Sequence, residues 1–449
     1  MKRNQNLTKL ASLFIAAPIF GLSVANGCYA GSFQIEEAAK LAPATPVTPA
    51  ETKTPSATDD ATGPAKTSAP EAVKSAKPKL ALAQQKKLAS ELFALTKTAK
   101  SSKQLTAMIA KCDSATTAGL NEKYFAYVRS LKAWALNRRG NNRYETARQL
   151  KAIGNVTQYS IAFDQVINDF NESISIDTAR YRTFNSRGIA FVLNEQYLKA
   201  AQDFTKAVGL KADFTQGYFN RAEALSALGK YQLAVKDYTT ALRLTSDDTQ
   251  ALTGRGHANV ALKKYETALA DFDAVIKAYP NNVVAWVNRG DCHAAAGDWK
   301  LSLADYASAK KLTHADQLAG GSTKLSDLAD QRTAWVLATA SDAGIRDAAK
   351  AIALIEPCVN RSSSPTVAML ETLAAAQAAT GDFTEAKQSQ SQVIKLVGAE
   401  VSGDETEGSP HQIRMALYEE DKAYVQAGAE VVCSSGELVT LNFDKECKD

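Results

Sequence analysis

The sequence lacks the residue patterns of most catalytic and metal sites. Its 449 residues include only four histidines, with no His-x3-His pair, and six cysteines, with no Cys-x2-Cys pair; both spacings are typical of zinc sites. There is also no Gly-x-Ser-x-Gly sequence, no phosphate-binding loop and no dinucleotide-binding glycine pattern, so the common signatures of hydrolases and nucleotide-dependent enzymes are absent. We therefore expect no catalytic residues, no cofactor and no metal site.

A strong excess of one charge is also missing. The chain carries 52 Lys and Arg against 48 Asp and Glu, a formal net charge of +4. Three of the positive charges, Lys2, Arg3 and Lys9, lie in the first ten residues, so the rest of the chain is close to +1. Because binding to nucleic acid requires a basic face, the composition does not favour a nucleic-acid partner.

Long apolar runs are confined to the start of the chain. Leu10 to Val24 is a 15-residue apolar stretch behind the basic residues, shorter than the ~20 residues that span a bilayer. This arrangement is typical of a secretory signal, which we assign to residues 1–30. We expect an exported protein, periplasmic or extracellular, with no other membrane span.

The end of this leader has several interpretations. Cleavage could follow Ala25 (Ser23-Val24-Ala25) or Ala30 (Cys28-Tyr29-Ala30). Alternatively, Cys28 is a lipidated N-terminus, although the preceding residues lack the Leu that bacterial lipoproteins prefer, or the leader remains as an uncleaved anchor. Residues 31–79 follow, rich in Ala, Thr, Pro and Lys and holding seven of the twelve prolines. Such a composition predicts a disordered tether.

A repeat of 34 residues is the main feature that the sequence does contain. Four kinds of residue recur at this interval: a large residue, an arginine, a small residue and an aspartate. They are Phe184, Tyr218, Leu252 and Trp286; Arg187, Arg221, Arg255 and Arg289; Gly188, Ala222, Gly256 and Gly290; and Asp203, Asp237, Asp271 and Asp305. A period of this length indicates a solenoid of helical hairpins.

Each repeat predicts two helices, because its apolar residues recur at steps of three and four. The helices are joined at Asn194–Glu195, Gly229–Lys230, Lys263–Lys264 and Gly297–Asp298. Glycine at two of these joints suits the end of a helix. The arginines of the first helices and the aspartates of the second helices are expected to pair and to fix the register between helices.

These residues resemble the tetratricopeptide repeat (TPR) family, whose pattern sets large, small and aromatic residues at fixed offsets over 34 positions. Trp286-x3-Gly290 and Ala268-x3-Phe272 match it, and four consecutive units cover residues 181–314. The resemblance implies an all-α fold, a right-handed superhelix of hairpins whose first helices line a concave groove.

The resemblance also indicates which residues face this groove. We expect the peptide-binding residues to be Asn185, Phe219, Asn220, Glu223, Thr253, His257, Asn288 and Asp291. Family members that clamp a C-terminal carboxylate use an asparagine where this chain has Ile189, Glu223, His257 and Asp291, so we expect that clamp to be absent. Because these positions differ between repeats, we expect specificity to lie there.

Looser helical patterns precede and follow the regular repeats. Residues 80–180 predict divergent hairpins, interrupted at Asn137–Arg143 by a polar, basic loop that is either a contact site or solvated. A break in phase at His314–Thr323 separates the regular repeats from two degenerate hairpins in residues 315–400.

The end of the chain predicts a cap and a tail. We expect a capping helix within residues 401–427, because Ser409-Pro410 is typical of a helix start. Residues 428–449 predict an irregular tail or a short β-hairpin. Cys433 and Cys447 in this tail are candidates for a disulfide, the alternative being two free thiols, and export would permit the bond. The other post-leader cysteines, Cys112, Cys292 and Cys358, fall within helical patterns and are expected to be buried.

Together these features predict a non-enzymatic scaffold that binds a partner protein or extended peptide in the groove, outside the cytoplasm. The alternative is a structural component of the cell envelope, tethered by its N-terminus. Neither interpretation identifies the partner.

Overall fold

The computed structural model describes residues 80–318, 323–398, 410–427, 430–433 and 438–439. The expected signal peptide and tether lie outside the described residues, as does Cys447 of the expected disulfide. The chain forms two compact units, one over Gln34–Ala212 and another containing Asp213–Asp449, here called the N-terminal and C-terminal units. Within the described ranges, no helix is both long enough and apolar enough to cross a membrane.

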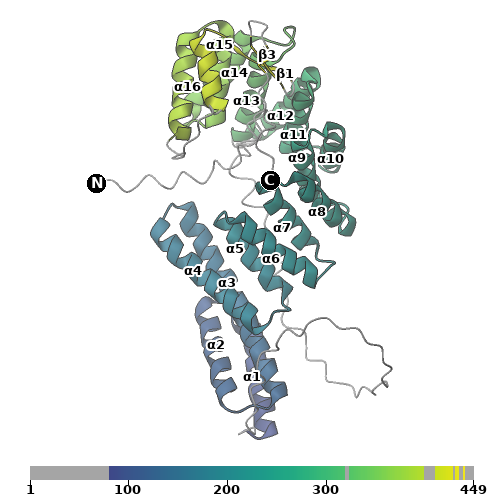
Figure 1. The fold of residues 1–449 in the computed structure, drawn as a ribbon, viewed down its shortest axis with the longest axis vertical. Helices are drawn as coiled ribbons and strands as arrows, with labels where there is room; N and C mark the ends of the chain where they lie inside the picture. The colour runs from purple at the N-terminus through teal and green to yellow at the C-terminus, as the bar shows by residue number, and fades with distance from the viewer. Residues whose placement is uncertain (1–79, 319–322, 399–409, 428–429, 434–437, 440–449) are drawn as a thin grey trace, which may run out of the picture. The chain divides into compact units, whose positions relative to one another are not determined.

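The N-terminal unit is built from helices that pack against their neighbours in sequence, as Figure 1 shows for α3 and α4. Its described helices are α1 (Leu82–Thr98), α2 (Ser102–Thr117), α3 (Glu122–Ala152), α4 (Val156–Ile176), α5 (Tyr181–Leu193) and α6 (Tyr197–Leu210).

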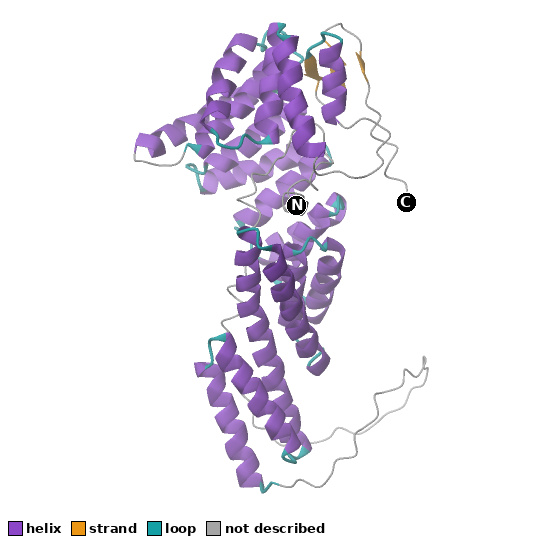
Figure 2. Cartoon of the chain, turned by 90° about the vertical axis from the view of Figure 1, so that its left-hand side faces the viewer, coloured by secondary structure: helices purple, strands orange, loops and turns teal. Residues whose placement is uncertain are grey.

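The C-terminal unit continues the same pattern of hairpins and ends in a small sheet. Its described helices are α7 (Thr215–Ala227), α8 (Tyr231–Leu244), α9 (Thr249–Ala261), α10 (Tyr265–Ala278), α11 (Val283–Ala296), α12 (Trp299–Leu318), α13 (Lys324–Thr339), α14 (Ala348–Arg361), α15 (Val367–Thr380), α16 (Phe383–Gly398) and α17 (Pro410–Glu419). Strands β1 (Tyr424–Ala427), β2 (Glu430–Cys433) and β3 (Leu438–Val439) pair antiparallel in that order, beside the helices in Figure 2. The all-α fold of stacked hairpins is confirmed.

Each hairpin of the regular repeats closes by seating an aromatic ring on a small residue. A Cβ atom added to Gly188 of α5 would lie 2.6 Å from the ring of Phe204 on α6. The same relation holds between Gly290 of α11 and Tyr306 of α12, also at 2.6 Å. The ring therefore packs directly against the backbone of the first helix, which explains why the small residue recurs every 34 positions.

The repeated arginines join two hairpins at once. Arg289 donates from Nε and Nη2 to Asp305, sixteen residues later, at 2.9 and 2.6 Å. Its Nη1 donates to Asp273, sixteen residues earlier on the preceding second helix, at 2.6 Å. The same pattern links Arg187 to Asp203 and Asn171, and Arg255 to Asp271 and Thr239. The expected pairing is confirmed, and it fixes the register between neighbouring hairpins as well as within each one.

The hairpin α3–α4 belongs to the same series, although its period is disguised. Asp169 and Phe170 of α4 lie 34 residues before Asp203 and Phe204. Arg139 Nη2 donates to Asp169 at 2.6 Å, and a Cβ atom on Gly140 would lie 2.6 Å from the ring of Phe170. The arginine, small, aspartate and aromatic positions are therefore all occupied.

The 34-residue interval is lost at Arg139 because both helices are extended by the same number of residues next to their joint. Arg139 lies thirteen residues before the end of α3, whereas Arg187 lies six before the end of α5. Asp169 lies thirteen residues after the start of α4, whereas Asp203 lies six after the start of α6. The arm of each helix on the side of the joint is therefore seven residues longer, about two turns, and α3 is also extended at its N-terminal end.

Three predictions of local structure are wrong. Asn137–Arg143 is not a loop but the interior of α3, because Asn137 and Asn141 are buried and Gly140 packs on α4. The predicted break at His314–Thr323 starts too early, because α12 continues to Leu318 and no glycine or proline lies between Trp299 and Gly320. The capping helix ends at Glu419 rather than near Ala427, because Asp421 adopts a left-handed φ of 54° and the chain then enters β1.

Candidate functional site

The first helices of the C-terminal unit form one continuous layer. Helix α7 contacts α9, α9 contacts α11, α11 contacts α13, and α13 contacts α15. This layer, the inner layer below, is where the resemblance places a ligand-binding groove. Of the eight expected groove residues, seven lie on α7, α9 and α11, while Asn185 lies on α5 of the N-terminal unit.

The structure buries five of these eight residues. They are Asn185, Phe219, Asn220, Glu223 and Asp291. Asn220 has no exposed surface, and its Oδ1 accepts a hydrogen bond from Gln216 at 3.0 Å. The interior of the chain therefore occupies the polar atoms that a ligand would need, and only Thr253, His257 and Asn288 keep part of their surface exposed.

The residues at the most variable groove position are matched to the aromatic ring of their own hairpin. The hydroxyl of Tyr238 donates to Glu223, and that of Tyr306 donates to Asp291 at 2.6 Å. Where the ring is Phe204 or Phe272, the corresponding residues are Ile189 and His257. An acid thus stands where the ring carries a hydroxyl, so the variation between repeats at Glu223 and Asp291 reflects packing inside each hairpin.

Two of the expected groove residues have shifted pKa values. Burial raises the pKa of Glu223 from 4.5 to about 7, and the hydrogen bond from Tyr238 opposes that rise only in part. Burial lowers the pKa of His257 below 6.5 despite its hydrogen bond with Asn288, so its imidazole is neutral near pH 7.

The remaining exposed groups form a small uncharged polar face on α9 and α11, the α9–α11 face, defined by Thr253, His257 and Asn288. The ring of His257 lies 5.5 Å from that of Phe272, which fixes its orientation. Asn288 shares a hydrogen bond with His257 across two neighbouring first helices. The Nε2 atom of His257 is itself buried, so the amide of Asn288 and the hydroxyl of Thr253 are the groups that can donate or accept a hydrogen bond, as recognition of a peptide backbone requires.

Beyond α11, buried polar contacts tie the inner layer together. Arg332 of α13 lies 3.2 Å from the carboxylate of Asp291 on α11. Gln331 of α13 donates to Thr372 of α15 at 2.8 Å. Sequence reasoning missed these contacts, because no fixed spacing connects the residues on either side of the break in the repeat.

Another buried charged group in the layer is Glu371 of α15, which interacts with Arg414 and His411 of α17. Burial alone would raise the pKa of Glu371, but the charge of Arg414 and the contact with His411 outweigh it and lower that pKa. The guanidinium of Arg414 also lies 5.9 Å from the ring of Trp335 and 5.4 Å from that of Tyr424. Arg414 is thus held by one carboxylate and two aromatic faces.

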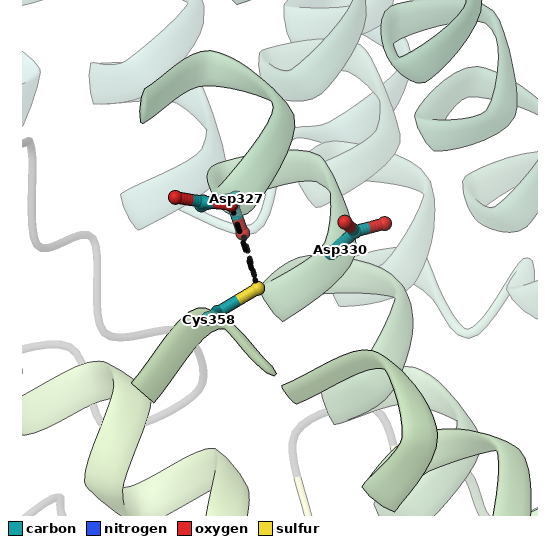
Figure 3. A group of neighbouring side chains, drawn as sticks. All are labelled: Asp327, Asp330 and Cys358. Carbon is teal, nitrogen blue, oxygen red and sulfur yellow. Dashed lines mark hydrogen bonds between the residues drawn. The ribbon is translucent and has the colours of Figure 1, made fainter. Parts of the chain in front are cut away.

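One group of side chains has the composition of a metal site, and Figure 3 shows it: Asp327 and Asp330 of α13 with Cys358 of α14. Asp327 accepts a hydrogen bond from Arg361 at 2.6 Å, and Asp330 pairs with Lys310. Burial raises the pKa of the Cys358 thiol to about 11, so the thiol is protonated near pH 7 and is a poor ligand. The group is an ion-pair cluster within the protein. Cys358, Cys112 and Cys292 are all buried free thiols, as expected.

Comparison with known proteins bears directly on the repeats. A tetratricopeptide repeat family model matches residues 219–283 and 253–316. A solved tetratricopeptide repeat protein from Parabacteroides merdae is 16% identical, covering 62% of this chain and 99% of that one, with a TM-score of 0.46. YrrB, described as a TPR protein with an unusual peptide-binding site, is 19% identical over 39% of this chain and 91% of its own, with a TM-score of 0.32. The first TPR of Spaghetti (RPAP3), bound to an HSP90 peptide, is 28% identical over 27% and 95%, with a TM-score of 0.26.

Proposed function

The chain is a tetratricopeptide repeat protein, and we propose that it is an interaction scaffold that binds an extended peptide segment of a partner protein across α9 and α11. The observation that carries this proposal is the α9–α11 face. It is the part of the expected groove whose polar residues keep exposed surface, and it places the hydroxyl of Thr253 and the amide of Asn288, which His257 holds by a hydrogen bond, on two neighbouring helices.

The chemistry of the face indicates the kind of peptide that it takes. His257 is neutral near pH 7 because burial lowers its pKa, and neither Thr253 nor Asn288 carries a charge. Asp291, the nearest acid on α11, is buried and is held by Tyr306 and Arg332. We therefore expect the ligand to be recognised through its backbone amides and uncharged polar side chains, and expect binding to depend little on salt.

The test is a peptide selection followed by measurements on single variants. Peptides selected from a display library on the full chain are measured by fluorescence anisotropy against N288A, H257A and the control N281A. Asn281 is an exposed asparagine in the turn before α11. We expect N288A and H257A each to weaken binding at least tenfold and N281A to leave it unchanged. Equal binding by all four proteins contradicts the assignment of the α9–α11 face.

The proposed location is outside the cytoplasm, as the leader in residues 1–30 suggests. A structural role in the envelope, through a retained or acylated N-terminus, is the alternative. The N-terminal mass of the protein purified from its native source separates the two: a chain beginning after Ala25 or Ala30 supports the free scaffold, whereas an acylated Cys28 or an intact Met1 supports tethering.

A further inference from the structure

The last two first helices of the inner layer, α13 and α15, are covered by a later segment of the same chain. Ala334 of α13 packs with Ala351, Ile355 and Cys358 of α14, and Ala374 of α15 packs with Ala386 of α16. These alanines hold the place that Gly290 holds in the regular repeat. This equivalence extends the groove positions into helices where the 34-residue period has been lost.

Two groove positions can then be identified. Glu371 lies three residues before Ala374, as Thr253 lies three before Gly256. Trp335 directly follows Ala334, as His257 follows Gly256. Glu371 and Trp335 therefore stand at the positions that, on α9, hold the residues of the α9–α11 face.

Both positions are covered by residues 410–427, called the C-terminal strap below. Glu371 interacts with His411 and Arg414 of the strap. Trp335 donates from Nε1 to Gln426 at 2.8 Å, and its ring lies 5.8 Å from that of Tyr424. Strand β1 contacts both α13 and α15 and makes a parallel bridge from Gln426 to Ala340. Part of the strap thus crosses the inner layer as an extended chain.

The contacts of the strap combine apolar packing with specific polar contacts. Leu417, Tyr418 and Tyr424 pack in one cluster with Ala374, Ala378 and Ala386, and α17 contacts α16. Beside this cluster lie an ion pair, cation–π contacts and one indole hydrogen bond. Four buried polar atoms at this interface have no hydrogen-bond partner among the described residues: Gln390 Oε1, His411 Nε2, Arg414 Nε and Tyr418 Oη. Since a finished core satisfies nearly all such atoms, these orphaned groups weaken the seating of the strap.

We propose that α13 and α15 form a second peptide-binding surface, which the C-terminal strap occupies in cis. Its ligand is a peptide that contains an arginine, because Glu371 and Trp335 together offer a buried carboxylate and an aromatic face that match a guanidinium. A partner of this kind competes with the strap and displaces it. The surface is separate from the α9–α11 face, so either proposal can fail without the other.

The test releases the strap in the full-length chain by changing only strap residues. R414E removes the cation that faces Glu371, and Y424A/Q426A removes the contacts to Trp335, so both variants keep the proposed receptor surface intact. The probe is a fluorescein-labelled synthetic peptide with the sequence of residues 410–427. Its anisotropy is measured with each protein, alongside hydrogen exchange of the protein itself.

We expect both variants to lose amide protection in α17 and β1 while α13 to α16 stay protected. We expect the probe to bind both variants at least tenfold more tightly than the wild-type chain, and a probe with alanine in place of Arg414 to bind at least tenfold more weakly. R361E is the matched control: it reverses a partly exposed arginine of α14 that pairs with Asp327, and it should leave the strap protected and the probe unbound.

Two results overturn the proposal. If both variants lose protection throughout α13 to α16, the strap is part of the core. If α17 and β1 open but the probe does not bind, α13 and α15 are not a receptor for such a peptide.

Discussion

The hydroxyl of Tyr238 donates a hydrogen bond to the buried carboxyl group of Glu223, which lies on the other helix of the same hairpin. This pair differs from Tyr306 and Asp291, where Arg332 adds a positive charge. Among the described ion pairs, Glu223 has no basic partner. The protonated form of its carboxyl is therefore favoured in the folded protein.

This pair predicts that the free energy of unfolding decreases as the pH rises. The pKa of Glu223 rises from 4.5 to about 7 on folding, so the folded state binds the extra proton between these values. The contribution is complete below pH 4.5 and is lost as the pH rises through 7, which amounts to about 3 kcal/mol. E223Q, which cannot ionise, should be more stable than the wild type at pH 8 by a margin that shrinks at pH 4.5. Urea unfolding at both pH values measures this margin; an unchanged difference between the two proteins contradicts the prediction.

The contact between Gly188 and Phe204 predicts opposite effects of one substitution at two glycines. G188A places a Cβ atom 2.6 Å from the ring, so the ring must shift, and we expect a loss of about 1–3 kcal/mol. G209A lies on α6 with nothing within 4 Å of the added atom, and should gain about 0.5–1 kcal/mol. Chemical denaturation gives both values. Equal effects at both sites would mean that the ring does not rest on the backbone.

The arginine series predicts that a lysine is not an adequate replacement. R289K keeps the charge but cannot bind Asp305 through two nitrogens and Asp273 through a third. We expect a loss of about 1 kcal/mol, because the pairs are partly exposed, whereas R243K at an exposed arginine of α8 should change stability by less than about 0.5 kcal/mol. Calorimetry of the two variants measures both effects. An R289K variant as stable as the wild type would show that neither the two-nitrogen contact to Asp305 nor the contact to Asp273 adds to stability.

The matched extension of α3 and α4 predicts that two deletions together are milder than either alone. Removing residues 146–152 and 156–162 takes seven residues from each helix and gives the arms next to the joint the lengths that they have in α5–α6. We expect the double deletion to fold, with Arg139 still paired to Asp169, and each single deletion to lose cooperative unfolding. Circular dichroism melts of the three proteins are the measurement. A double deletion that melts like the single ones would show that the extension is essential to the fold.

The sequence was sufficient to predict the fold because its strongest signal, the 34-residue period, arises from contacts that each hairpin must make. Gly188 with Phe204 and Arg187 with Asp203 recur because the same packing recurs. The hairpin α3–α4 was predicted only as a divergent one, because fourteen added residues separate Arg139 from its place in that period. Its Asn137–Arg143 segment has the composition of a loop, and only the packing of Gly140 on Phe170 shows why it is helical.

The candidate site was harder to predict, because exposure depends on residues distant in sequence. Asn220 and Asp291 stand at groove positions, but Gln216, Tyr306 and Arg332 occupy their polar atoms. The rule that specificity lies where repeats differ fails at Glu223, since the difference there follows the hydroxyl of Tyr238. The strap contact between Glu371 and Arg414 joins residues 43 positions apart without a repeating interval, so no spacing could have indicated it.

The extension of α3 and α4 shows that the length of a hairpin can change without changing its contacts with the neighbouring hairpins. Seven residues turn a helix to within about 20° of two full rotations, so every side chain beyond the added segment returns to nearly its former azimuth. Lengthening both arms by this step leaves the arginine and the aromatic ring facing their old partners. The arms of such a hairpin can therefore be lengthened in steps of seven residues while the contacts between neighbouring hairpins stay the same.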